Sequence, residues 1–228
     1  MRRPGGQERS DPGMRRERGL TIPDAAGRND LAAFVEHALR LDEAAVVRLR
    51  ARSDGLVAAW VATGLDVLAV RVVAGQLNPV DLSCGADELA KGLRGADDSG
   101  YIDTGYPMDS AWRGGLPPDT GFTHVDDVPA AVLTELAGRG AGLAKEHSSA
   151  HGPPASLMDQ DVLQVSSGDA AVGVPMRCVF ALTAMGFVPE SPGPDEIVRV
   201  RLSPTWLRID ARFGSVYRRR GDPALVLR

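Results

Sequence analysis

The sequence predicts an α+β fold with two layers, in which helices cover one face of a mostly antiparallel sheet. Residues 45–76 and 197–213 contain β-branched runs in which apolar and arginine side chains alternate with the period of a strand. Residues 30–41 place apolar side chains at helical spacing, and residues 175–185 are apolar almost throughout. These patterns predict a three-strand meander and a C-terminal hairpin in the sheet, with helices packed on it.

The first predicted helix covers residues 30–41. Its apolar side chains recur at i, i+3, i+4, i+7 and i+8, and they are Leu31, Phe34, Val35, Ala38 and Leu39. Asp30 precedes this stripe and is a residue type that caps helix N-termini. We therefore expect a surface helix with one buried stripe.

The predicted meander has turns at residues 53–55 and at Gly64. In its first strand Arg48, Arg50 and Arg52 alternate with apolar residues, which gives that strand a basic outer face. The third strand is apolar on both sides apart from Arg71. Such a strand is expected at the centre of a sheet or under a helix.

Beyond Asn78 and Pro79, residues 82–93 are predicted to form a short helix. Residues 101–124 then form a long loop that contains four aromatic residues and three prolines. Ordered loops of this length are uncommon and are often functional. The aromatic content favours an ordered loop, with a single helical turn at residues 109–112.

Residues 126–129, Asp-Asp-Val-Pro, are predicted to start a helix that runs to about Glu146. Gly138, Gly140 and Gly142 interrupt it, and each costs about 1 kcal/mol relative to alanine in a helix. The glycines therefore indicate either close packing against a neighbouring element or a frayed second half.

Residues 162–165 and 170–174 are predicted to form a small hairpin that leads into the apolar helix at residues 175–185. Gly186 suits the left-handed position that follows a helix, where the next residue, Phe187, contacts the last turn at Leu182. An apolar surface on nearly all sides identifies this helix as a core helix.

The C-terminal hairpin has one apolar face and one charged face. The apolar face consists of Val198, Val200, Leu202, Leu207, Ile209, Ala211 and Phe213. The opposite face consists of Arg199, Arg201, Trp206, Arg208, Asp210 and Arg212. The first set is expected in the core and the second set in contact with water.

Length and composition favour one folded unit. The 228 residues, 43% of them hydrophobic, suit a single α+β domain over residues 21–228, with a subdivision near residues 95–125 as the alternative. Residues 1–20 read as a disordered basic tail. The net charge of -4 argues against a general nucleic-acid binder, although residues 196–228 hold eight arginines against three acidic residues.

Nothing in the sequence indicates a metal, a cofactor or a membrane. Cys84 and Cys178 belong to no CxxC pair, and they are expected to be reduced thiols of a cytoplasmic protein. Glu146, His147 and His151 form an EHxxxH pattern, but the glycine and prolines after it interrupt the helix that a zinc site would need. No stretch reaches the roughly 18 apolar residues of a membrane helix.

Catalysis has weak support in the sequence. The nucleophile-elbow, P-loop, dinucleotide-binding and Cys-His motifs are absent. The catalytic candidates are Asp103, Asp109, Arg113 and His124, which all belong to the 101–124 loop. His124 could act as a general base only with a carboxylate at hydrogen-bond distance.

Three functions are compatible with these features. The favoured one is a non-catalytic interaction or regulatory protein of the cytoplasm, which holds a protein partner or a second copy of itself through the arginine-bearing sheet face or the aromatic loop. The second is a nucleic-acid-binding protein that uses the same arginines. The third is an enzyme with its site in the 101–124 loop. The candidate binding residues are Arg199, Arg201, Trp206, Arg208, Arg212 and Trp112.

The segments DSAWRGGLPP and VPMRCVFALTAMGF are distinctive. In these two segments, and in its general composition, the chain resembles uncharacterised proteins of high-GC actinobacteria. This resemblance covers most of the chain after the tail, and it implies a source but no activity.

Overall fold

An eight-stranded antiparallel sheet runs through the whole protein. The computed structural model describes residues 18–147, 154–168 and 170–221. The strands follow the order β6-β2-β3-β4-β13-β12-β11-β8. Their bounds are β2 Val46–Ala51, β3 Leu56–Ala62, β4 Leu68–Ala74, β6 Asp81–Gly85, β8 Thr123–Pro129, β11 Ile197–Leu202, β12 Trp206–Ala211 and β13 Gly214–Arg219.

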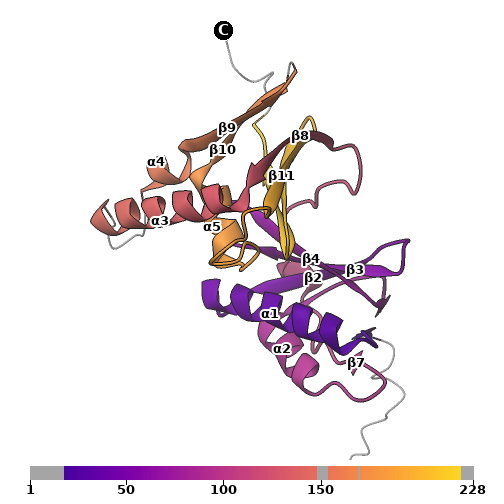
Figure 1. Ribbon diagram of the computed structural model, residues 1–228. Helices are drawn as coiled ribbons and strands as arrows, with labels where there is room; N and C mark the ends of the chain where they lie inside the picture. The colour runs from indigo at the N-terminus through magenta and orange to yellow at the C-terminus, as the bar shows by residue number, and fades with distance from the viewer. Residues whose placement is uncertain (1–17, 148–153, 169, 222–228) are drawn as a thin grey trace, which may run out of the picture.

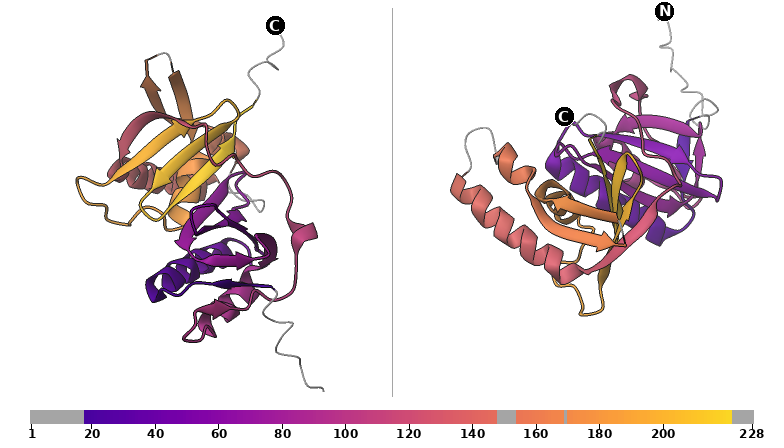
Figure 2. Two further views of the ribbon diagram at one scale, coloured as in Figure 1. Left: turned by 90° about the vertical axis from the view of Figure 1, so that its right-hand side faces the viewer. Right: turned by 90° about the horizontal axis from the view of Figure 1, so that it is seen from above.

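The centre of this sheet joins two halves of the chain. We call residues 18–102 the first half, residues 123–221 the second half, and residues 103–122 the connecting loop. β4 of the first half pairs with β13 of the second half, with Tyr217 opposite Leu68. Figure 2 shows the two halves one above the other, with the connecting loop beside them. The predicted meander and C-terminal hairpin therefore belong to one sheet, as expected.

The helices lie on one face of the sheet (Figure 1), which confirms the predicted two-layer arrangement. They are α1 Ala25–Leu41, α2 Ala86–Arg94, α3 Ala130–His147, the single turn α4 Ala155–Met158, and α5 Met176–Ala184. α1 packs on β4 and α5 packs on β13. Each half therefore contributes one helix to the cover of the central strand pair.

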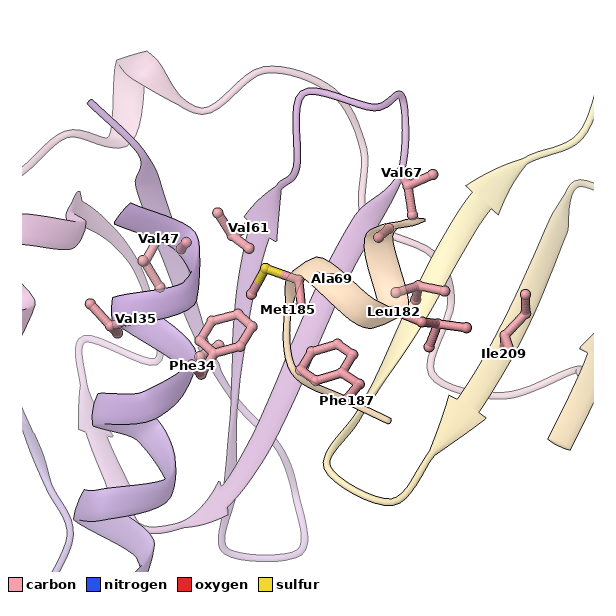
Figure 3. Packing of buried hydrophobic residues seen from close by; sticks show 14 of the residues in the cluster. Phe34, Val35, Val47, Val61, Val67, Ala69, Leu182, Met185, Phe187 and Ile209 are labelled. Atoms are coloured by element: carbon pink, nitrogen blue, oxygen red, sulfur yellow. The ribbon is translucent and has the colours of Figure 1, made fainter. Parts of the chain in front are cut away.

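The main core lies between these helices and the sheet (Figure 3). Phe34 of α1 stacks on Phe187, with ring centroids 6.1 Å apart and planes 4° from parallel. Phe187 follows α5, where Gly186 has a φ of 64° and donates its N–H to the carbonyl of Thr183. The N–H of Phe187 donates to the carbonyl of Leu182, which completes the predicted Schellman cap.

Two smaller sheets flank the main one. β1 Gly19–Thr21 lies between β5 Gln76–Asn78 and β7 Tyr101–Ile102. β9 Asp161–Ser167 and β10 Ala170–Pro175 form the predicted small hairpin, whose turn includes Asp169, outside the described residues. Of the predicted 1–20 tail, residues 1–17 also lie outside them.

Close packing explains one glycine of α3. A Cβ on Gly140 would lie 2.6 Å from Cε of Met176, so this glycine lets α3 approach α5 closely. A Cβ on Gly138 or Gly142 would meet nothing within 4 Å. The close-packing interpretation is therefore correct for Gly140 alone.

The prediction of a helix from residue 82 is wrong at its start. Residues 82–85 belong to β6, which pairs with β2, and the helix begins only at Ala86. Leu82, Ser83 and Cys84 are all buried, so both faces of this strand are covered. A strand covered on both faces shows no alternation of apolar and polar residues, which is why its pattern resembled a helix.

Two predicted helix starts are also wrong. Residues 126–129 belong to β8, where Asp127 lies opposite Arg199 instead of capping a helix. A register shift between Val200 and Arg201 disturbs the strand period and hides it in the sequence. α1 begins before Asp30, because Asp24 is the N-cap and its Oδ2 accepts the N–H of Gly27 at 3.1 Å.

Candidate functional site

A second apolar cluster lies on the sheet face opposite the helices. It consists of Ala58, Trp60, Val70, Trp206 and Tyr217, from β3, β4, β12 and β13. The rings of Trp60 and Tyr217 are 5.1 Å apart and tilted by 55°. Because these strands include the β4–β13 pair, the cluster spans the junction of the two halves.

The connecting loop covers this cluster. Trp112, Leu116 and Phe122 pack against it, and the ring of Phe122 meets that of Tyr217 edge-on at 5.7 Å. Arg208 lies over both rings, 5.6 Å from the centroid of Phe122 and 5.4 Å from that of Tyr217. Burial raises the pKa of Tyr217 to about 12. Trp112 and Phe122 of the loop are therefore ordered by contact with the sheet, whereas Tyr106 is 83% exposed.

Beside this cover lies a cavity of about 330 Å³, which we call the junction pocket. Its lining residues are Ala62, Gly64, Asp66, Val67, Leu68, Arg113, Gly114, Gly115, Trp206, Tyr217 and Arg219. They come from the first half, the connecting loop and the second half. The cavity therefore depends on the way in which the two halves meet.

The turn between β3 and β4 forms one wall of the junction pocket. Thr63 and Val67 close this turn, since the N–H and the hydroxyl of Thr63 both donate to the carbonyl of Val67, at 3.1 and 2.9 Å. Gly64 and Asp66 have φ angles of 74° and 57°, in the left-handed region. The wall is thus a defined turn.

The junction pocket carries two arginines against one carboxylate, that of Asp66, whose Oδ2 lies 3.7 Å from Arg177 Nη1, so its rim is cationic on balance. Arg113 and Arg219 are exposed, and within the described part of the chain no carboxylate lies within 4.0 Å of either guanidinium. Trp206 and Tyr217 supply an aromatic wall next to these charges. An apolar cavity beside such cations can hold an apolar group that carries or adjoins a negative charge.

The candidate arginine row of the hairpin is compensated by carboxylates. Arg199 lies 3.4 Å from Asp127, and Arg208 lies 2.7 Å from Asp210. Arg201 Nε lies 3.0 Å from Asp210 Oδ2 without hydrogen-bond geometry, so this contact is only ionic. Arg212 likewise lies 3.0 Å from Glu196.

The meander shows the same compensation. Arg48 donates two hydrogen bonds to Asp81, at 2.8 and 2.7 Å, and these bonds raise the pKa of Arg48. Arg52 lies 3.1 Å from Asp54. Of the arginines on this strand face, Arg50 has no carboxylate within 4.0 Å among the described residues. The two arginine-bearing strands therefore present little uncompensated charge.

The four catalytic candidates have different neighbours. Asp103 lines a separate cavity of about 410 Å³ with Glu88 and Lys91, whereas Arg113 lines the junction pocket. Asp109 accepts the N–H of Ser83 at the β6 edge. His124 Nε2 lies 2.9 Å from Asp127 Oδ1, and this hydrogen bond lowers the pKa of the exposed Asp127 carboxyl. The structure does not place the four side chains in one cavity.

The remaining candidates are the EHxxxH pattern and the two cysteines. His151 of the EHxxxH pattern lies outside the described residues, and those described contain no group of three or more His, Cys, Asp or Glu able to hold a metal ion. Cys84 and Cys178 are buried, and burial raises the pKa of each thiol to about 12. Among the helices that the structure describes, none has the length and apolarity needed to span a membrane.

Sequence reasoning missed the junction pocket. Of its lining residues, Arg113 and Trp206 were candidates, but Tyr217, Arg219 and the β3–β4 turn were not. The only local signal was the pair of glycines at residues 114–115 and the turn at Gly64. The pocket forms through the β4–β13 pairing, which a sequence without a known register does not reveal.

Comparisons with known protein families divide the chain into two matched segments. Residues 15–114 match the family "Domain of unknown function (DUF8010)". Residues 117–223 match the family "Domain of unknown function (DUF8185)". A search of curated proteins finds no match.

Solved structures with a similar fold are DNA polymerase sliding clamps. The DNA polymerase III beta subunit assigned in Eubacterium rectale has a TM-score of 0.58 and 10% identity, and the match covers 90% of this chain and 65% of that one. For the beta subunit from Streptococcus pyogenes the TM-score is 0.54, the identity 11% and the coverage 92% and 67%.

The Caulobacter crescentus beta sliding clamp was crystallised with polyethylene glycol at a proposed beta-motif tethering region. It has a TM-score of 0.51 and 14% identity, with coverage of 86% and 63%. This chain therefore spans about two thirds of the length of the clamps that it matches. At these identities the comparison establishes a clamp-like fold.

Proposed function

We propose that this protein is a non-catalytic, clamp-like protein that works in association with DNA and docks a segment of a partner protein in the junction pocket. The observation that carries this proposal is the clamp-like fold, which extends over 86–92% of the chain. The placement of the candidate residues supports a binding role more than a chemical one, because the catalytic candidates have separate neighbours.

The shape and chemistry of the junction pocket support docking of a short segment. Its volume of about 330 Å³ suits one or two side chains, and Trp206 and Tyr217 provide aromatic contact area. Arg113 and Arg219 stand at the rim. The segment that fits best has an apolar anchor with an acidic residue or a free carboxylate next to it.

A direct contact with DNA is the second candidate function, and the likeness to DNA polymerase clamps favours it. The charge pattern argues that such a contact is weak. The arginines of the hairpin row each have a carboxylate within 3.4 Å, and phosphate binding must compete with those carboxylates. Arg50, Arg113 and Arg219, which meet no carboxylate among the described residues, are the arginines we expect to reach phosphate.

Self-association is part of the proposal, and the two edges of the main sheet differ in their suitability. At the β6 edge, the N–H of Ser83 donates to Asp109, and its carbonyl accepts from Met108 N and Arg18 Nη2, at 2.9 and 2.8 Å. The protein's own chain therefore occupies that edge. β8, at the opposite end of the sheet order, is the edge that we propose for a second copy.

Selection of a displayed peptide library on the full chain tests the docking proposal. Selected peptides are expected to share an apolar residue next to an acidic one, and Arg219→Glu should weaken their binding about tenfold or more in fluorescence anisotropy. Arg50→Glu is the matched control, since it reverses an exposed arginine outside the pocket. Equal losses in both variants, or no enriched peptide, would overturn the proposal.

The DNA contact is tested with a fluorescein-labelled duplex at about 50 mM and about 200 mM salt. We expect measurable binding at the lower salt concentration and about 40-fold weaker binding at the higher one, because about three neutralised phosphates give a slope of about -2.7 in log K against log salt concentration. Size-exclusion chromatography with light scattering measures self-association in the same samples. Salt-independent binding would contradict a contact made by arginines.

A further inference from the structure

We propose that Arg177 is a positioning residue for the junction pocket: from the second half, it holds the β3–β4 turn of the first half in the conformation that forms the pocket wall. Arg177 itself does not line the pocket. This inference rests on the proposed docking function. It adds to that function the element that fixes the two halves at the site.

Arg177 bridges the two halves with one guanidinium group. It is the second residue of α5, and 13% of its side chain is exposed. Its Nη1 donates to the carbonyl of Leu65 at 2.8 Å and lies 3.7 Å from Oδ2 of Asp66, both in the β3–β4 turn. Its Nη2 donates to Oδ1 of Asp159, the C-cap residue of α4.

A second arginine fixes the same carboxylate. Arg218 Nη2 donates to Oδ1 of Asp159 at 3.2 Å. Arg218 belongs to β13 and follows Tyr217, which lies opposite Leu68 in the β4–β13 pair and lines the junction pocket. Asp159 therefore joins α4, α5 and β13, and Arg177 extends this network into the turn.

The hydrogen bond from Arg177 stabilises a β3–β4 turn whose own hydrogen bonds do not use the carbonyl of Leu65. The internal hydrogen bonds of the turn join Thr63 to Val67 and the N–H of Leu65 to the Thr63 hydroxyl, at 3.4 Å for the latter, whereas the carbonyl of Leu65 accepts from Arg177. The left-handed φ of 57° at Asp66 is a conformation that is unfavourable for a residue with a Cβ. Asp66 and Val67 line the pocket, so a change in the turn moves the pocket wall.

The chemistry of the guanidinium explains why arginine suits this position. A planar group with donors on separate nitrogens can bond a carbonyl and a carboxylate at the same time. An ammonium group is a point charge on a flexible stem, so a lysine side chain at this position would favour one of these acceptors without fixing both. We therefore expect Arg177→Lys to retain part of the effect and Arg177→Met to lose it.

The experiment measures probe affinity and local hydrogen exchange in the full chain. The probe is naphthalene-2-sulfonate, an aromatic anion that matches the aromatic wall and the cationic rim, and the indole N–H of Trp206 reports its binding by NMR. We expect Arg177→Met to weaken the probe about tenfold, Arg177→Lys to weaken it less, and exchange of the Thr63 and Leu65 amides to accelerate about tenfold.

Controls separate this inference from the docking proposal and from general destabilisation. Arg139→Met removes an exposed arginine whose partner is Glu135 on the same helix, and it should change neither readout. Asp159→Asn removes the carboxylate that accepts from Arg177 and Arg218, and it replaces Arg177→Met in the experiment if that variant does not fold. Unchanged exchange of the Thr63 and Leu65 amides in Arg177→Met would overturn the positioning role, even if the probe does not bind. If Arg177→Met does not fold, unchanged exchange in both Arg177→Lys and Asp159→Asn would overturn it. If the probe binds and Arg219→Glu does not weaken it, the docking proposal fails instead.

Discussion

The contact between Phe34 and Phe187 predicts that the two halves unfold together. Phe187 is 1% exposed and Phe34 is 2% exposed, and their rings stack across the boundary between the halves (Figure 3). Truncation of a buried phenylalanine to alanine costs about 3–5 kcal/mol. The backbone of Gly214, at the start of β13, lies against one edge of the Phe187 ring, since a Cβ on Gly214 would lie 2.5 Å from that ring. Because this backbone limits collapse into the cavity, we expect Phe187→Ala to cost about 4 kcal/mol.

Urea unfolding followed by tryptophan fluorescence and circular dichroism measures this effect. A double-mutant cycle with Phe34→Leu and Phe187→Leu should give a coupling energy of about 1 kcal/mol, the usual contribution of an aromatic pair beyond its buried area. The reasoning also requires coincident transitions in both signals. Two separate transitions, with only one of them shifted by Phe187→Ala, would show that the halves fold independently and would refute it.

Three further predictions follow from local environments. Gly138→Ala should stabilise the protein by about 1 kcal/mol in thermal unfolding, because its Cβ meets open space. Gly140→Ala should not stabilise it, because its Cβ would press on α5. Equal effects of the two substitutions would contradict the close packing. Cys84 and Cys178 should not react with a thiol reagent at a pH of about 8 in the folded protein, since burial holds the pKa of each near 12; fast labelling would contradict this. The hydrogen bond from His124 lowers the pKa of Asp127, so the stability from this contact is present above the carboxyl's ordinary pKa and is lost as the pH falls through the pKa of the folded protein. His124→Gln should therefore raise the Asp127 pKa in an NMR titration. An unchanged pKa would exclude the contact.

Period-two patterns were sufficient to predict most of the main sheet. β2 and β11 each bury one side of the strand, so apolar residues alternate with polar ones, whereas β3 is apolar and buried on both sides and is recognised as a short apolar run between turns. β6 and β8 were mistaken for helical segments because one is covered on both sides and the other carries a register shift. In both cases the partner strand, not the local sequence, determines the structure.

The candidate surfaces depended still more on long-range pairing. The sequence displays Arg199 and Arg208 as a basic row, but it does not show that Asp127 and Asp210 lie beside them in the sheet. The junction pocket needs β4 and β13 to pair, and these strands are far apart in the chain. The aromatic loop can be found in the sequence, but the surface that it covers cannot.

The central position of β13 also affects the order in which the protein can be assembled during synthesis. β4 ends at Ala74, and its partner β13 begins only at Gly214. A ribosome adds about 5–20 residues per second, so it needs roughly 7–30 s to synthesise the roughly 140 residues between these two positions. During this time the edge of β4 that will pair with β13 has no partner strand. The first half therefore leaves the ribosome with β4 as an unpaired edge strand, and a binding factor that shields this edge would raise the yield of folded protein.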